Sequence, residues 1–216
     1  LITSSGPAII NDLNLSDFQF GLLTGLIFVF FYSIMGLFMG ALADRVHRPR
    51  LIAAGLVLWS ALTALSGVTK NFVQIGMARL FIGVGESAMT PSAISMIADL
   101  FPKEKRGTAM GIYYLGVPLG AGGSFVVAGI LGPMIGWRNC FLLLGVTGLV
   151  LAMALLFLKD PKRGAMEEKG AVVAEEHEAE LMTGNWRSVV YEVFSVVKST
   201  PALAWTMIGA VFLHIP

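Results

Sequence analysis

The chain has 216 residues, of which 56% are hydrophobic and 13% are charged, and its formal net charge is +1. Its mean hydropathy of +0.76 lies well above the soluble range and indicates an integral membrane protein. The small net charge gives no indication of nucleic-acid binding, and the single cysteine, Cys140, excludes an intrachain disulfide and a cysteine-based metal cluster.

The apolar residues gather in runs that are long enough to cross a bilayer. Residues 1–10 read as the end of one helix, and the polar turn after them holds Ser16 and Gln19 at capping-box spacing. Complete spans are predicted at 17–43, 51–69, 72–100, 107–132 and 139–158. The last run, 202–216, is too short to cross the membrane, so we expect a piece of a longer protein.

Loop charges predict the orientation of the spans. The loops after the spans 17–43 and 72–100 hold six cations. The loops after 1–10, 51–69 and 107–132 hold two, Lys70 and Arg138. The positive-inside rule places the former loops in the cytoplasm, together with the segment 159–200. We expect a multi-pass protein of the plasma (inner) membrane.

The cytoplasmic segment 159–200 has two parts. Its first part is acidic and suits a solvated linker or an exposed helix. In 185–199, apolar residues follow helical spacing, which predicts an amphipathic helix at the membrane surface. Packing of that face on a soluble neighbour is the alternative. A seventh span begins at 201–216.

Two opposite charges lie inside the apolar run ARLFIGVGESAM. Arg79 and Glu86 are seven residues apart, so they lie on nearly the same helix face, about 10 Å apart along the axis. A charge at bilayer depth is costly unless it is paired or hydrated, so this face should look into a protein interior or a wet cavity. A buried glutamate beside a moving cation can exchange its proton, as a proton-coupled carrier requires. A static ion pair that locks two helices is the alternative.

The fifth span combines glycines with a proline. Because proline frees a backbone carbonyl and glycine permits bending, we predict a hinge at Gly116, Pro118 and Gly120. A short echo between PAIINDL and PSAISMIADL also predicts that 1–69 and 72–158 are inverted repeats of three helices each.

A charged motif follows the second span. In GALADRVHRPR, Gly40, Asp44, Arg45 and Arg48 resemble the signature loop of the major facilitator superfamily, and the segments 98–111 and 136–143 also match patterns typical of it. His47 stands where the common pattern has glycine, and Pro49 where it has a basic residue.

The resemblance implies an all-α membrane protein with two six-helix lobes joined by a cytoplasmic loop. Residues 1–158 would be the N-terminal lobe, and the C-terminal lobe of the same protein would be its partner. The resemblance also implies a cytoplasmic gate formed by the signature loop and its charge contacts, which we assign to Gly40, Asp44, Arg45, Arg48 and Asp99, with Arg106 as a further member. Asp99 is a natural partner for Arg45 or Arg48.

Within the superfamily, the segments RLFIGVGESAMTPSAISMIADLF and YYLGVPLGAGGSF look most like the spinster branch of lipid transporters. That branch is similar in having an arginine and a glutamate at the positions of Arg79 and Glu86. It also has an acidic proton site in its first helix, so we predict a carboxylate just upstream of Leu1.

These patterns favour a secondary active transporter that works by alternating access. We expect Arg79 to hold the anionic group of a lysophospholipid or sphingolipid-like substrate and Glu86 to carry or tune the proton. A proton gradient would supply the energy, with no cofactor or metal and with membrane lipids as neighbours.

Other function classes fit the sequence less well. An organic-anion or drug/proton transporter of another branch, or a non-transporting receptor or scaffold, is the alternative. We expect no enzyme activity, because His47, His177 and His214 all fall in loops or at the chain end.

Overall fold

A computed structural model gives the fold, and it describes residues 1–166, 191, 194–195 and 198–199. Most of the predicted surface helix at 185–199 and all of the predicted seventh span at 201–216 lie outside the described residues. Every regular element in the described part is a helix, which confirms the all-α class.

The described helices follow one another with short connections. They are α1 (Gly6–Leu13), α2 (Asp17–Thr24), α3 (Leu26–Ala43), α4 (Arg48–Ser66), α5 (Phe72–Ser87), α6 (Met89–Leu100), α7 (Lys103–Val126), the π-helical η1 (Val127–Leu131), α8 (Gly132–Ile135) and α9 (Trp137–Leu155).

Five segments of the described chain are long and apolar enough to cross a membrane. They are Asp17–Ala43, Arg48–Ser66, Phe72–Leu100, Lys103–Ile135 and Trp137–Leu155. The bounds predicted at 17–43 and 72–100 are confirmed, and the spans predicted at 51–69, 107–132 and 139–158 are confirmed with ends shifted by two to four residues. The span predicted at 51–69 begins earlier, at Arg48, because Pro49 sits in the first turn of α4, where the backbone N–H that proline lacks would have no helical acceptor.

Side-chain caps fix where α2 and α5 begin. The backbone N–H of Gln19 donates to Ser16 Oγ at 3.2 Å, and the N–H of Ser16 donates to Gln19 Oε1 at 3.0 Å, which confirms the predicted capping box. At the start of α5, the N–H of Gln74 donates to Asn71 Oδ1 at 3.0 Å.

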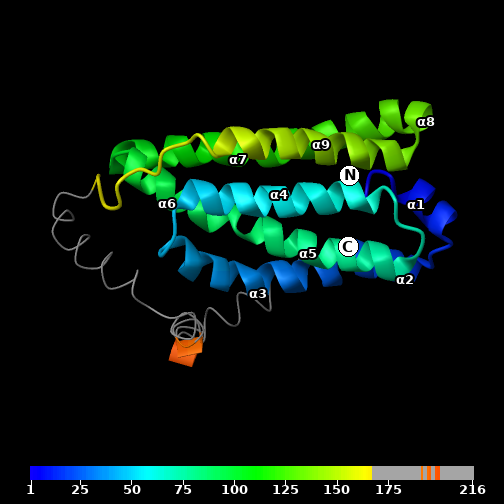
Figure 1. Ribbon diagram of the computed structural model, residues 1–216, viewed down its shortest axis with the longest axis horizontal. Helices are drawn as coiled ribbons and strands as arrows, with labels where there is room; N and C mark the ends of the chain where they lie inside the picture. Colours follow the sequence, from blue (N-terminus) through cyan, green and yellow to red (C-terminus); the bar gives the residue numbers. More distant parts are fainter. Residues whose placement is uncertain (167–190, 192–193, 196–197, 200–216) are drawn as a thin grey trace.

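The long helices form a bundle with α4 near its middle (Figure 1). Helix α4 packs against α5 on one side and α9 on the other, while α3 packs against α5. Helices α1, α2 and α8 gather at one end of the bundle, and α6 lies toward the opposite end (Figure 1).

Small residues let α4 approach its neighbours closely. A Cβ on Gly55 would lie 2.5 Å from the carbonyl oxygen of Gly85, and one on Gly145 would lie 2.6 Å from Ala64 Cβ. The backbone of α4 therefore touches both α5 and α9, which is how membrane helices gain van der Waals contact without a hydrophobic driving force.

The apolar core near α1 orients α5. Its buried members are Ile2, Ile9, Leu13, Leu15, Leu23, Ile75, Trp137 and Phe141. Ile75 lies one turn before Arg79, so the face of α5 that carries the predicted charges is turned toward α1 and α2.

Candidate functional site

Arg79 is held by the broken helix α2–α3. Its Nε donates to the carbonyl oxygen of Leu23 at 3.3 Å, and its Cζ lies 4.6 Å from the centroid of the Phe28 ring. In the described part of the chain, its two Nη groups donate to no protein acceptor. Each Nη group can donate two hydrogen bonds.

Glu86 lies next to the end of α5 and is half-buried. It interacts electrostatically with Arg79, but within the described residues no ion pair joins the two side chains. The static ion pair that the sequence left as an alternative is therefore not formed in this structure.

One polar aromatic side chain, that of Tyr113, interacts with Glu86. Tyr113 of α7 lies close to Thr90 of α6 and interacts electrostatically with both Glu86 and Tyr32 of α3. Tyr32 stacks on Phe28 with ring centroids 5.7 Å apart. The site thus offers one cation, one carboxyl group, hydroxyl groups and aromatic faces, and its residues come from four helices.

A second charge cluster lies at the α6 end of the bundle, centred on Arg48. Arg48 is fully buried and forms ion pairs with Asp99, at the end of α6, and with Asp160. Its Nη1 also donates to Ser95 Oγ at 2.9 Å, and its Nη2 donates to the carbonyl oxygen of Pro161 at 2.6 Å. The predicted pairing of Asp99 is present, and Arg48 is the partner.

The segment after α9 completes this cluster. Arg163 donates to the carbonyl oxygens of Ala43 at 2.8 Å and Val46 at 3.0 Å, and its Nη1 lies 3.8 Å from Asp44 Oδ1. The N–H of Gly164 donates to Asp99 Oδ1 at 2.9 Å. Residues 160–164 therefore cover the ends of three helices.

Sequence reasoning did not select Asp160 or Arg163. It read the segment KDPKRG only as positive charge that orients the last span. The usable signal was Asp160 among three cations at the end of a span, a pattern like that of the loop after α3, where an aspartate is followed by arginines.

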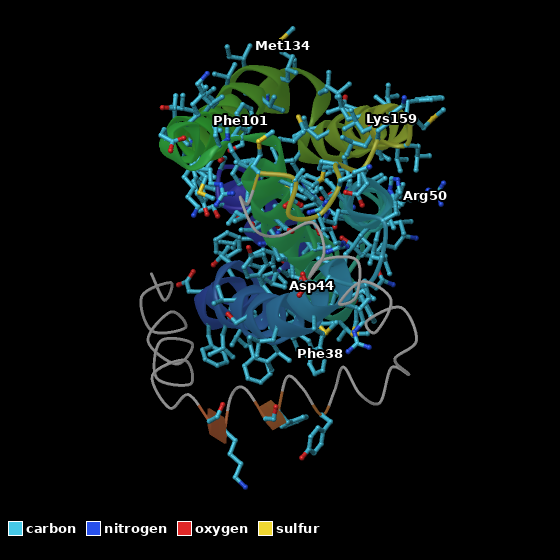
Figure 2. All side chains as sticks on the ribbon, turned by 90° about the vertical axis from the view of Figure 1, so that its left-hand side faces the viewer. Phe38, Asp44, Arg50, Phe101, Met134 and Lys159 are labelled. Carbon is cyan, nitrogen blue, oxygen red and sulfur yellow. The ribbon has the colours of Figure 1, made fainter. Side chains whose placement is uncertain are left out.

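Figure 2 looks onto this end of the molecule. The labelled Asp44, Phe101 and Lys159 mark the connections that follow α3, α6 and α9, and Arg50 marks the start of α4 (Figure 2). The loops that the sequence assigned to the cytoplasm thus share one end of the bundle, as that assignment requires.

Other predicted gate residues have local contacts. A Cβ on Gly40 would meet Pro91 Cβ at 3.9 Å, so α3 passes near α6 there. Arg45 is half-buried beside Asp44. Arg106 donates to the carbonyl oxygens of Phe101 at 3.1 Å and Ala98 at 2.8 Å, so it closes the end of α6. Its membership of the gate stays a prediction.

The predicted hinge lies within α7. Gly116, Pro118 and Gly120 are exposed, and α7 continues through Pro118 as far as Val126. The departure from α-helical geometry comes later, in the π-helical turn η1. Hinge motion at Pro118 stays a prediction.

A third charge cluster joins loops at the opposite end. Arg138 pairs with Asp12 at 3.0 Å, stacks its guanidinium 4.5 Å from the Trp137 ring centroid, and donates to the carbonyl oxygens of Gly67 at 3.1 Å and Thr69 at 2.5 Å. Trp137 Nε1 donates to the same Asp12 carboxylate at 3.0 Å. Sequence reasoning used Arg138 only to orient the spans.

A metal centre has no support in the described part of the chain. No group of three or more His, Cys, Asp or Glu side chains lies close enough there to hold an ion.

Comparison with protein families decides the class of the chain. The family model of the Major Facilitator Superfamily matches residues 1–215. The chain belongs to the major facilitator superfamily. The motif at Gly40, Asp44, Arg45 and Arg48 is thus the loop of a major facilitator protein, as the resemblance implied.

Two relatives within the superfamily illustrate its range. An MFS-type efflux pump of Mycolicibacterium smegmatis is 31% identical over 148 residues, which are 68% of this chain and 34% of that protein. A sphingosine-1-phosphate transporter of Danio rerio is 30% identical over 148 residues, which are 67% of this chain and 29% of that protein.

A solved structure assigns the branch. The crystal structure of a bacterial homolog of the human lysosomal transporter spinster, in an inward-facing and occupied conformation, has a TM-score of 0.67 and 34% identity to this chain. The match covers 78% of this chain and 42% of that one, so this major facilitator chain spans less than half of the length of these relatives. The spinster resemblance is confirmed, and the relatives are transporters and a pump rather than enzymes.

Proposed function

We propose that the protein is a proton-coupled secondary transporter that moves a lipid-like organic anion by alternating access. The observation that carries this proposal is the arrangement around α5. Arg79 and Glu86 share one helix face inside a membrane span, and they do not pair with each other. Charges kept apart at this depth favour a site that exchanges ligands.

Arg79 is the group proposed to bind the anion. A guanidinium matches the geometry of a phosphate and donates two parallel hydrogen bonds to it. The Nη groups of Arg79 are without a protein acceptor within the described residues, so a headgroup phosphate would complete their hydrogen bonding. The rings of Phe28 and Tyr32 would contact the apolar part of an amphiphile.

Glu86 is the proposed proton carrier in the described part of the chain. Binding of an anion at Arg79 weakens the electrostatic stabilisation of a Glu86 carboxylate and so favours its protonation. The predicted carboxylate upstream of Leu1 belongs to the same proposal as a second proton site.

The Arg48 cluster is the proposed cytoplasmic gate. It joins the signature loop to Asp99 and to the segment after α9, at the end of the lobe that a lobe rotation would open or close. Import or export across the plasma (inner) membrane is compatible with this gate.

A drug/proton transporter is the second candidate, favoured by the similarity to an MFS-type efflux pump. The two candidates differ in the substrate that a proton gradient drives. A panel of lipids, drugs and sugar acids separates them.

The test uses the complete chain in proteoliposomes with lysophosphatidylglycerol as the probe and an imposed pH gradient. We expect Arg79→Gln to reduce uptake at least about tenfold, which corresponds to the loss of one charge-assisted contact. Glu86→Gln should abolish the part of the flux that depends on the gradient. Glu104→Gln, an exposed glutamate at the start of α7, is the matched control and should behave as wild type.

Each unfavourable result has a definite meaning. Undiminished gradient-driven flux in Glu86→Gln would remove the proton role of that residue. Flux of drugs or sugar acids without lipid flux would replace the lipid proposal with the second candidate.

A further inference from the structure

The break between α2 and α3 leaves backbone groups for Arg79. Gly25 separates the two helices with φ of −113° and ψ of −93°, outside the helical region. Carbonyl groups in the last turn of a helix lack helical partners. The Thr24 hydroxyl lies 3.0 Å from the carbonyl oxygen of Phe20 and 3.4 Å from the carbonyl oxygen of Gly21. Arg79 Nε donates to the carbonyl oxygen of Leu23.

Close contact between α3 and α5 brings Phe28 to the level of Arg79. Gly83 lies one turn after Arg79, and a Cβ there would be 3.1 Å from the Phe28 carbonyl oxygen and 3.4 Å from the Tyr32 nitrogen. The absence of a side chain at Gly83 lets the two backbones approach. The Phe28 ring then lies against the guanidinium, with Tyr32 stacked on it.

We propose that the Leu23 carbonyl and the Phe28 ring form a seat that holds Arg79 apart from Glu86 and ready for an anionic headgroup. Phe28 is then a positioning residue of the transport site. This inference rests on the proposed role of Arg79 in binding the anion.

The physical reason for such a seat is competition. In a region of low dielectric constant, a guanidinium and a carboxylate on one helix face attract each other strongly. A direct pair would neutralise both, leaving no positive charge for a substrate and no carboxylate for a proton. An aromatic face attracts a cation through its quadrupole, and a carbonyl group attracts a cation through its dipole. Neither group carries a net charge, so the positive charge of the guanidinium is not cancelled. The seat therefore stabilises Arg79 while its charge stays available.

The test measures binding of lysophosphatidylglycerol to the purified complete chain by scintillation proximity, which stays readable when transport is lost. We expect Phe28→Leu to raise Kd roughly fivefold to tenfold, because the cation–π contact is removed. Phe28→Tyr keeps the ring face and should retain the wild-type Kd. Phe30→Leu, at a side chain that is 47% exposed, is the matched control and should also leave Kd unchanged.

A double-mutant cycle separates positioning from packing. If Phe28 acts through Arg79, Phe28→Leu should weaken binding no further in the Arg79→Gln background. Phe28→Met supplies a second ring-free variant that must behave like Phe28→Leu, so a folding defect of one variant does not decide the result.

The outcomes distinguish this inference from the function on which it rests. Fully additive effects, or wild-type binding by Phe28→Leu and Phe28→Met while Arg79→Gln binds weakly, would overturn the seat and leave the role of Arg79 intact. Wild-type binding by Arg79→Gln would overturn the proposed function itself.

Discussion

Arg48 and Asp160 are joined twice. The backbone N–H of Arg48 donates to Asp160 Oδ2 at 2.8 Å, and its Nε donates to Asp160 Oδ1 at 2.8 Å. Asp160 thus caps the N-terminus of α4 and neutralises a guanidinium that is fully buried. The same carboxylate interacts favourably with the dipole of α4 and with the charge of the Arg48 guanidinium, and it connects the chain after α9 to the signature loop.

Removal of Arg48 should strongly destabilise the protein. Arg48→Ala leaves Asp99 and Asp160 without their shared cation, and loss of one partner of a buried pair typically costs roughly 3–5 kcal/mol. We expect a clear fall in the Tm of the complete chain in detergent, measured by a thermal unfolding assay. Arg50→Ala, at an exposed position two residues on, should leave Tm close to wild type. Equal Tm values for the two variants would contradict the central place of Arg48.

The cluster at the opposite end predicts an order of effects. Arg138→Gln should lower Tm more than Asp12→Asn, because Arg138 also donates to the carbonyl oxygens of Gly67 and Thr69. Both effects should be modest, about 2 kcal/mol or less, since Arg138 is 35% and Asp12 46% exposed and water screens their attraction. The assay is thermal unfolding at low and high salt, and Lys70→Gln is the control. A larger effect of Asp12→Asn would show that the carbonyl contacts of Arg138 are unimportant.

The contact between α4 and α5 predicts opposite outcomes for two glycines. Gly55→Ala would push a Cβ to 2.5 Å from the Gly85 carbonyl oxygen, so the helices must separate at a cost of roughly 1–3 kcal/mol. At Gly21 in α2, a Cβ meets nothing within 4 Å, and alanine should leave stability equal or slightly higher. Thermal unfolding of both variants checks this difference, and a stable Gly55→Ala protein would contradict the observed helix contact.

The hydroxyl group of Tyr113 should matter for transport. Tyr113→Phe removes a polar group beside Glu86 and Thr90, so we expect a fall of severalfold in proton-driven uptake of lysophosphatidylglycerol. Tyr114→Phe is the matched control, because that side chain is 47% exposed and should tolerate the loss of its hydroxyl. Equal uptake rates in the two variants would show that Tyr113 contributes only to packing.

Local patterns predicted the elements well. The capping box at Ser16 and Gln19 starts α2 as its spacing indicated, and the span Phe72–Leu100 has the predicted bounds. Both follow from interactions between residues that are near in sequence, or from the length of chain needed to cross the bilayer. The sequence limited the predicted partners of Asp99 to Arg45 and Arg48, because both arginines lie in one short loop.

Contacts between distant residues were not predictable in this way. Asp160 and Arg163 looked like ordinary loop charges, and the role of Leu23 and Phe28 beside Arg79 had no signature in an apolar run. The break at Gly25 decides which carbonyl is open to Arg79, and a break depends on how neighbouring helices pack.

The sequence by itself determined that this chain crosses a membrane, where its spans lie, which loops share a side, and that Arg79 and Glu86 share a face. The bilayer imposes these features through hydrophobic length and the cost of moving charge. The tertiary structure alone decided which partners the charges take. Arg48 lies between two carboxylates, and Arg79 lies on a carbonyl and an aromatic ring rather than on Glu86. Partner choice depends on distances between helices, which are set by the close approach of neighbouring helices at Gly55, Gly83 and Gly145 and not by any local pattern.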